Sequence, residues 1–421
     1  MRLLPTFARM PVGAVVLAVL AGCGGAGNGE PLAGIPAVEP VPVVSAAPVP
    51  PLSPLPPTSR EALGRQLFHD VNLSQPAGTS CASCHDPRQG FAGNHGGIIG
   101  VAVGSKPSSS GLRNTPTTMY GQFTPAFSVT TTNGVSRARG GQFVDGRVDT
   151  LAQQALGPLL ASAEMNNPSA AAVVAKVASS AYAADFKRVW GNDIFTRTTD
   201  AFTAIGQSIE AYERTAEQRP FTSRYDDLLR GRNSFTASER RGMAVFFDRS
   251  KGNCTACHTA NNTVADPNAS LFTNHTYAAL GVPRNLAIPA NSVATFFDLG
   301  LAGPQRSAPA GMNNAAGQFK VPTLRNVALK KAFMHNGFFK SLNDVVTFYA
   351  TRDLSPQRWY PAGQIFNDLP LALRSNVTRQ APFDLRPGDR PRLAPGDVAD
   401  VVAFLGTLND APAIAAFGTA Q

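Results

Sequence analysis

Two short motifs bring cysteine and histidine together at the spacing that covalent haem attachment requires. They occupy residues 81–85 (CASCH) and 254–258 (CTACH). In such a motif two thiols add across the haem vinyl groups, and the adjacent histidine becomes the proximal ligand of the iron. A zinc site would need two cysteine pairs with closed tetrahedral ligation, and a thioredoxin-like site has no need of a histidine after each pair. We therefore expect two covalently bound c-type haems, held by Cys81, Cys84, His85, Cys254, Cys257 and His258.

The two motifs lie in two copies of one module. A capping box precedes each, at residues 58–61 and 236–239, and opens an amphipathic helix. Downstream, a Pro-Thr pair and then a glycine recur, and a helix is predicted five residues after Gly146 and after Gly337. The span from histidine to glycine is 61 residues in the first copy (85 to 146) and 79 in the second (258 to 337). The second copy therefore carries an insertion, which we expect to be loop-like over residues 259–318.

The predicted fold is mostly α, with two cytochrome-c-like haem domains in tandem and few short strands. Helical periodicity is present over residues 58–68, 149–161, 169–190, 200–217, 236–247, 341–350 and 395–408, whereas regular strand alternation is scarce. The domain boundary is predicted in residues 231–234. The N-terminal haem domain then spans residues 58–233, and the C-terminal haem domain spans residues 234–421.

The N-terminus has the pattern of a targeting segment. Residues 1–22 combine a positive start with an apolar stretch of 11 residues, which is too short to span a bilayer. Leu-Ala-Gly before Cys23 resembles the lipobox of bacterial lipoproteins, and the alternative is an ordinary signal peptide with an incidental cysteine. Residues 23–57 are rich in proline and glycine and read as a tether. We expect the protein on the periplasmic side of a bacterial membrane, lipid-anchored at Cys23, which agrees with haem c being attached outside the cytoplasm.

Composition excludes several classes of protein. The chain has 421 residues, 43% of them hydrophobic and 15% charged, which is incompatible with a disordered polyelectrolyte. Five cysteines are too few for a disulfide scaffold and are accounted for by four haem links and one lipid anchor. The net charge of +9 is scattered without a run of like charges, so no nucleic-acid partner is expected.

The repeat also predicts what lies opposite each proximal histidine. Twelve residues after the repeat glycine the first copy has Pro158 and the second has Tyr349. Proline has no ligating side chain, so the first haem is expected to have an open distal position, whereas a tyrosine oxygen can bind ferric iron. Met334 is the rival ligand for the second haem. An open haem that splits a peroxide needs a group that moves a proton, and Glu164, with Gln154 one turn before Pro158, is the candidate.

The sequence resembles the bacterial di-haem cytochrome c peroxidase family, and within it the MauG-like branch. Besides the haem motifs, the matching segments are residues 113–117 (RNTPT), 142–147 (QFVDGR), 321–329 (VPTLRNVAL) and 333–337 (FMHNG). The resemblance implies a peroxidatic N-terminal haem, with Glu164 and Gln154 in its distal pocket, and an electron-transfer C-terminal haem. It also implies Tyr349 as the MauG-type ligand. A calcium ion is implied as well, held by the Asn114 side chain and the carbonyls of Lys330 and Ala332.

Two positions depart from the family. The inter-haem tryptophan is replaced by Val144, and residues 250–253 lack the tryptophan that MauG has before its second haem motif. The leading hypothesis is a peroxidase that reduces hydrogen peroxide with electrons from a small periplasmic redox protein. The alternatives are a MauG-like oxidase that modifies a protein substrate and a non-enzymatic di-haem electron carrier. Of the remaining histidines, His69 and His275 are expected at the surface or at helix caps.

Overall fold

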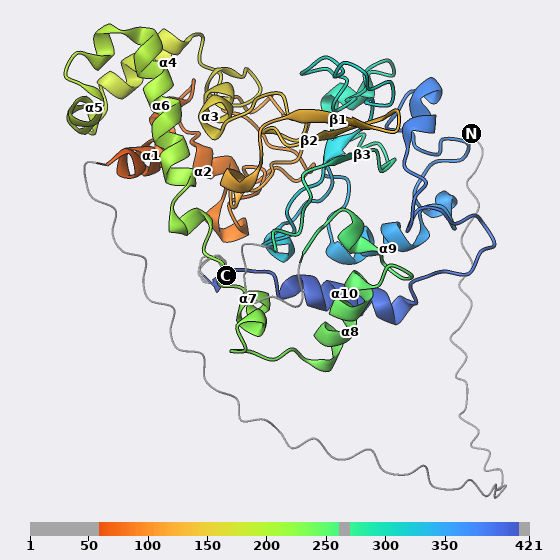
Figure 1. The fold of residues 1–421 in the computed structure, drawn as a ribbon. Helices are drawn as coiled ribbons and strands as arrows, with labels where there is room; N and C mark the ends of the chain where they lie inside the picture. The colour runs from red at the N-terminus through yellow and green to blue at the C-terminus, as the bar shows by residue number, and fades with distance from the viewer. Residues whose placement is uncertain (1–58, 261–269, 412–421) are drawn as a thin grey trace, which may run out of the picture. The chain divides into compact units, whose positions relative to one another are not determined.

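A computed structural model describes residues 59–260 and 270–411, which belong to one compact unit (Figure 1). The predicted signal segment, the tether and Cys23 lie outside the described residues. Within them, no helix is long and apolar enough to cross a membrane. The α-helices are α1 (Arg60–His69), α2 (Cys81–Cys84), α3 (Leu151–Leu160), α4 (Ala170–Ala178), α5 (Ala183–Trp190), α6 (Thr198–Glu213), α7 (Arg224–Leu229), α8 (Ala237–Phe247), α9 (Leu342–Thr351) and α10 (Pro395–Gly406).

Helices α1, α3 and α6 form the framework of the first half of the chain. The Ser59 side chain caps α1 by accepting a hydrogen bond from the backbone N–H of Ala62. Leu63, Leu67 and Phe68 then fall on one face of α1 and are buried against α6, which also packs on α3. Burying each of these side chains contributes about 1.5–3 kcal/mol.

Helices α8, α9 and α10 repeat this arrangement in the second half. Thr236 caps α8 in a reciprocal capping box with Glu239, as the sequence predicts. Helix α8 packs on α10 as α1 packs on α6, and α9 also contacts α10. Both close crossings depend on a glycine: a Cβ at Gly64 would lie 1.9 Å from the carbonyl oxygen of Ser208, and one at Gly242 would lie 1.9 Å from that of Asp400.

The loops that enter α3 and α9 have the same backbone course. Gly146 and Gly337 have φ of 66° and 61°, and three residues earlier Phe143 and Met334 have φ of 61° and 66°. Each helix begins five residues after its glycine, as predicted. The internal repeat is therefore a structural repeat, and Pro158 and Tyr349 occupy equivalent positions on α3 and α9.

The buried side chains form two main hydrophobic cores. The first core extends to Phe221, whereas Tyr225 on α7 is buried in the second core. Asp226, also on α7, forms a fully buried ion pair with Arg325 at 2.7 Å. Helix α7 thus packs with the second half, and the boundary in residues 231–234 stays a prediction.

The two halves are joined by contacts near the end of the chain. The Asp410 carboxylate accepts hydrogen bonds from the Tyr120 hydroxyl at 2.8 Å, the Asn326 amide at 2.7 Å and the backbone N–H of Thr222 at 2.9 Å. The carboxylate is buried, so these donors stabilise a group that would otherwise be costly to bury. The last described turn of the chain therefore connects residues of both halves.

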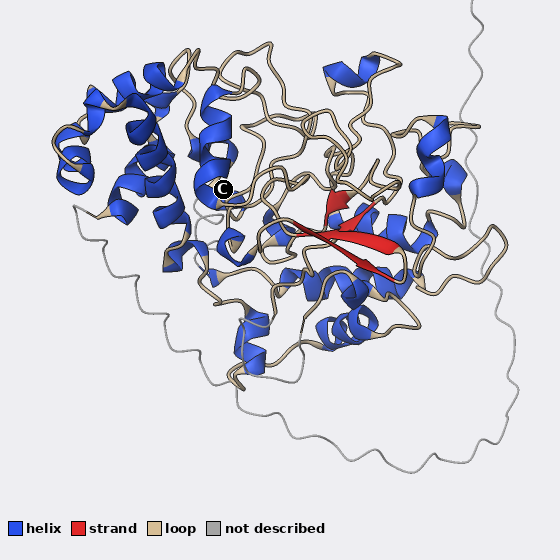
Figure 2. Ribbon diagram, turned by 45° about the horizontal axis from the view of Figure 1, so that its top comes forward, coloured by secondary structure: helices blue, strands red, loops and turns tan. Residues whose placement is uncertain are grey.

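Strands are few, and they lie where the insertion meets the first half (Figure 2). Strands β1 (Ser128–Thr132) and β2 (Val135–Arg139) form an antiparallel hairpin, with Ser128 opposite Arg139. Strand β3 (Tyr277–Ala278) pairs antiparallel with β4 (Phe319–Lys320). The described part of the insertion, residues 270–318, is mostly loop, as predicted, and packs on the hairpin through Ala138, Leu301, Met312 and Ala315.

The predominantly helical fold is confirmed, with two local differences. The helix predicted over residues 169–190 is two helices, α4 and α5, separated by a turn in which Tyr182 donates a hydrogen bond to Asp70. The short helices α2 and α7 do not appear among the predicted helices, because four to six residues are too few for a helical period to be recognised.

Replacing Gly242 by alanine should destabilise the second half, because the added methyl group would have to push α8 away from α10. We expect a loss of about 1–3 kcal/mol in the free energy of unfolding, measured by thermal and chemical denaturation of the holoprotein. The matched control is Gly406→Ala on α10, where nothing lies within 4 Å of the added Cβ. That variant should be neutral or slightly stabilising. Equal stability of the two variants would contradict the close-crossing argument.

Candidate haem sites

The first haem motif is presented by α2 and the turn that follows it. His85 is the C-cap of α2, and its Nδ1 lies 3.2 Å from the carbonyl oxygen of Phe91. A carbonyl can only accept, so Nδ1 carries the proton and Nε2 is left free for a metal. Burial lowers the pKa of His85 to about 4, which keeps the imidazole neutral as an iron ligand requires.

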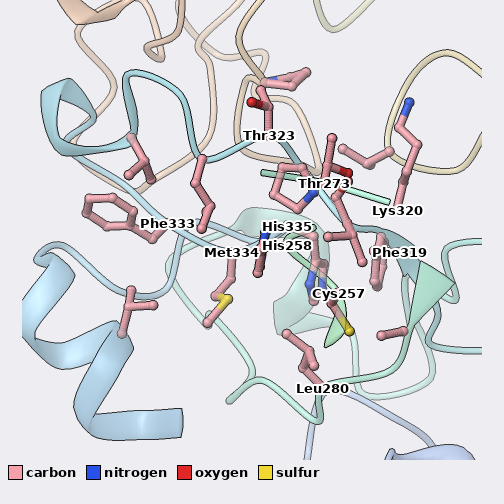
Figure 3. A pocket seen from close by; sticks show the side chains of 18 of the residues that line it. Cys257, His258, Thr273, Leu280, Phe319, Lys320, Thr323, Phe333, Met334 and His335 are labelled. Atoms are coloured by element: carbon pink, nitrogen blue, oxygen red, sulfur yellow. Dashed lines mark hydrogen bonds between the residues drawn. The ribbon is translucent and has the colours of Figure 1, made fainter. Parts of the chain in front are cut away.

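The second motif is built in the same way on a single 3₁₀ turn (Cys254–Ala256). Nδ1 of His258 lies 3.0 Å from the carbonyl oxygen of Phe272, and burial lowers the pKa of His258. Phe91 and Phe272 have φ of 53° and 54°, so the accepting carbonyls are presented by the same unusual backbone turn. Figure 3 shows Cys257 and His258 with Met334 among the side chains that line a pocket.

The residues present fit two covalently attached haems. A cavity is lined by His85 from the first motif and by Cys254, Cys257 and His258 from the second. None of the four motif cysteines is paired in a disulfide, so all four are available for thioether bonds, and burial raises the pKa of Cys81, Cys84 and Cys254 to about 12. A neutral imidazole and an apolar lining beside these cysteines suit a porphyrin.

Helix α3 carries two of the residues predicted on the distal side of the first haem. Gln154 lines the cavity, and Pro158 is half-buried one turn later. Because Pro158 has no N–H, it cannot close the helical hydrogen bond to the carbonyl of Gln154. The equivalent position in the second half is Tyr349.

Glu164 follows α3 in a tight turn. Its backbone N–H bonds to the carbonyl of Ala161 at 3.0 Å, and its own carbonyl accepts from Ser105 at 2.7 Å. The carboxyl group does not line the cavity, but it lies close enough to Cys81 and Cys84 to raise the pKa of both thiols. Burial raises the pKa of Glu164 itself, and the charge of Arg147 opposes that shift. A buried carboxyl group of raised pKa beside the haem motif is suited to moving a proton.

Arg147 belongs to a buried charge network that joins the halves. Its guanidinium lies 3.4 Å from the ring centroid of Phe143 and bonds to the fully buried Asp145 at 2.9 Å. Asp145 also accepts from Arg113 at 2.7 Å, and Arg113 in turn pairs with Asp298 of the insertion at 2.6 Å. The insertion therefore fixes the loop that carries Arg147, and through it the charge facing Glu164.

Tyr349 and Met334 both line the cavity beside the second motif. Burial raises the pKa of the Tyr349 phenol well above its usual range, and the thiols of Cys257 and Cys254 next to it raise it further. The phenol therefore lies close to the cysteines that would hold the second haem. The Tyr349 ring packs against Phe383, with centroids 5.0 Å apart.

Three further residues of the cavity lining were not predicted as site residues. His275, expected at the surface, is buried, because the insertion folds inward; its pKa falls to about 4 through burial and the nearby Lys320. Lys320 is partly buried and donates to the carbonyl of Gly141. Glu213 at the end of α6 is buried, its Oε2 has no hydrogen-bond partner, and burial raises its pKa to about 8. All three depend on contacts between distant segments, which no local pattern signals.

The residues expected to hold calcium do not fit a calcium ion. The Asn114 amide nitrogen, a donor, faces the carbonyls of Ala332 at 2.9 Å and Met334 at 3.2 Å. The Lys330 side chain is partly buried, and its ammonium donates to the carbonyl of Thr115, the residue after Asn114, at 3.2 Å. Burial lowers the pKa of Lys330 to about 8, which leaves the group protonated at neutral pH. A divalent cation needs converging oxygens and is repelled by an ammonium.

Comparisons with known proteins show the family to which the chain belongs. Residues 58–234 match the family model described as di-haem cytochrome c peroxidase. The chain is 38% identical over 366 residues to methylamine utilization protein MauG of Paracoccus denitrificans, covering 83% of this chain and 88% of that protein. It is 28% identical over 305 residues to cytochrome-c peroxidase IdrP1 of a Pseudomonas species, covering 68% of this chain and 71% of that protein.

The fold is also similar to a solved structure. The diheme peroxidase BthA of Burkholderia thailandensis superposes with a TM-score of 0.79 at 40% identity, covering 84% of this chain and 87% of that one. BthA is a diheme enzyme, in agreement with the paired haem motifs of this chain. The chain belongs to the family of di-haem cytochrome c peroxidases and MauG proteins, and is a di-haem oxidoreductase.

Proposed function

We propose that this protein reduces hydrogen peroxide at its N-terminal haem, with electrons that pass through its C-terminal haem. The observation that carries the proposal is the contrast between Pro158 and Tyr349 at equivalent positions of matched helices. One haem site lacks a ligand at that position and is free to take a substrate, whereas the other has a phenol. A pure electron carrier would need both irons closed, so the asymmetry supports an enzyme.

The haem, when bound, supplies the iron that takes the peroxide and the electrons that split its O–O bond. The protein supplies the proton movement. The Glu164 carboxylate would accept a proton from one peroxide oxygen and return it to the other, which leaves as water. Gln154, on the cavity wall, offers an amide that can hold the peroxide by hydrogen bonding. With two electrons and two protons, one hydrogen peroxide yields two waters.

In this proposal Tyr349 holds the second site closed. A phenolate is a hard anionic ligand and should stabilise the oxidised state of the second haem relative to methionine. Met334, which also lines the cavity, is the alternative ligand. Phe383 packs on the Tyr349 ring and fixes its plane beside Cys257.

The cofactors and setting follow from the same interpretation. Two covalent haems c lie in two cytochrome-c-like domains, and a small periplasmic redox protein of the c type supplies the electrons. We place the protein on the periplasmic side of a bacterial membrane, lipid-anchored at Cys23. Support comes from the targeting pattern of residues 1–23 and from the attachment of haem c outside the cytoplasm.

A second function is favoured by the similarity to MauG together with Tyr349. In that case the protein would use peroxide to oxidise another protein rather than to turn over a small donor. Val144 and the absence of tryptophan in residues 250–253 argue against it, because hole transfer would lack aromatic relays. Steady-state peroxide turnover with a reduced c-type cytochrome supports the peroxidase. Reaction with peroxide but no such turnover would favour the oxidase.

Replacing Glu164 by glutamine should slow the reaction of the holoprotein with hydrogen peroxide by about 10²–10⁴-fold, because the amide cannot accept the proton. Stopped-flow absorbance measures the rate. The control is Glu210→Gln, which removes a carboxylate paired with Arg214 on α6. A Glu164→Gln variant with the native rate would exclude Glu164 as the proton acceptor.

The rate of the reaction with hydrogen peroxide should depend on pH through the protonation of Glu164. Burial raises its pKa above the ordinary 4.5, and the group acts when deprotonated. The rate should therefore fall as the pH is lowered through this raised pKa, with the inflection above pH 4.5. The Glu164→Gln variant should lack that inflection, and an unchanged profile in the variant would assign it to another group.

Replacing Tyr349 by phenylalanine should remove the sixth ligand of the second haem and leave the first haem unchanged. We expect a second high-spin ferric signal in electron paramagnetic resonance and the loss of tyrosinate bands in resonance Raman spectra. Met334→Leu is the matched variant and should change neither signal. The opposite pattern, with only Met334→Leu altering the second haem, would identify the methionine as the ligand.

A further inference from the structure

A buried polar cluster joins the two halves where Asn94 and Asn114 meet Lys330 and Ala332. The backbone N–H of Thr115, which can only donate, bonds to Oδ1 of Asn94 at 3.0 Å. This contact fixes the orientation of the Asn94 amide. Its nitrogen then donates to Oδ1 of Asn114 at 3.1 Å.

The orientation of Asn94 fixes that of Asn114 in turn. Since Oδ1 of Asn114 already accepts from Asn94, Nδ2 must face the carbonyls of Ala332 and Met334. Turning the Asn114 amide over would set nitrogen against nitrogen on one side and oxygen against oxygen on the other. The cluster is therefore satisfied by hydrogen bonds from one half to the other, without a cation between the oxygens.

Lys330 brings a positive charge to the same place. Its side chain crosses from the second half to the carbonyl of Thr115 in the first half, 3.2 Å away, beside Asn114. The charge also lies within electrostatic reach of His85, the proximal ligand of the first haem. Among the described residues, no group of three or more His, Cys, Asp or Glu side chains could hold a metal ion, so no carboxylate cage offers calcium a better place.

We propose that the Lys330 ammonium, with the Asn94–Asn114 pair, takes the place of a divalent cation in joining the halves. The protein then needs no calcium to hold this interface, and a positive charge that shares the cavity lining with His85 is part of the chain. Such a charge stabilises the reduced, less positive state of the first haem. Lys330 is thus a positioning residue that acts through the interface and through His85, and the inference rests only on haem binding, not on peroxide turnover.

The native holoprotein tests the first half of the proposal. We expect well under one calcium per chain by elemental analysis after gel filtration. Neither excess EGTA nor added calcium should change the melting temperature or the haem absorption spectrum. One tightly bound calcium per chain, whose removal by EGTA shifts either signal, would overturn the proposal.

A pair of lysine variants tests the second half. Lys330→Met should lower the midpoint potential of the haem held by His85, measured by spectroelectrochemistry, because a nearby positive charge is lost. Lys331→Met removes the exposed neighbouring lysine and should leave that potential unchanged. Equal potentials in the two variants would show that the ammonium does not act on the haem. If Lys330→Met fails to fold, Lys330→Gln, which keeps a donor for the Thr115 carbonyl but removes the charge, replaces it in the potential measurement. The calcium measurements on the native holoprotein decide the first half in either case. Neither measurement depends on peroxidase activity. The inference about Lys330 can therefore fail while the proposed function holds, and the proposed function can fail while the inference holds.

Discussion

The hydrogen bond between each proximal histidine and a backbone carbonyl sets the orientation of the imidazole, and the rest of each haem site depends on that orientation. Phe91 and Phe272 hold Nδ1 of His85 and of His258, so the direction in which Nε2 can bind iron is set by main chain rather than by a mobile side chain. Once that direction is fixed, the side of the site opposite each proximal histidine is fixed as well. Helices α3 and α9, which follow turns of the same backbone conformation, then supply the side chains on that side. A single difference between proline and tyrosine at the same position can therefore separate a reactive haem from a closed one.

Much of this was predictable because it is encoded locally. A Cys-x-x-Cys-His motif is a property of five consecutive residues. The spacing from Gly146 to Pro158 could be compared with that from Gly337 to Tyr349 because the two loops have the same backbone conformation. The spacing of apolar residues predicted most of the helices for the same reason. A helix that buries one face, as α1 and α8 do, needs apolar residues at the helical period.

The features that could not be predicted arise from contacts between segments distant in sequence. His275 lies between polar neighbours, and only the inward fold of the insertion buries it. The orientation of Asn114 is set by Asn94, twenty residues away, and the position of Lys330 by Thr115 in the other half. The packing of α7 with the second half likewise depends on the buried pair of Asp226 with Arg325, which α7 makes only in the folded protein. Sequence patterns report the residue types at these positions, but not the partners that determine their chemistry.

The bonds made by Asp410 have a consequence for how the two cores depend on each other. Its carboxylate accepts from Tyr120 and Thr222 and also from Asn326, so one buried group after α10 satisfies donors that come from distant segments. Losing this carboxylate would leave those donors without their acceptor on both sides at once, and an unsatisfied buried donor destabilises the folded state. The polar interiors of the two halves are therefore coupled through a single side chain.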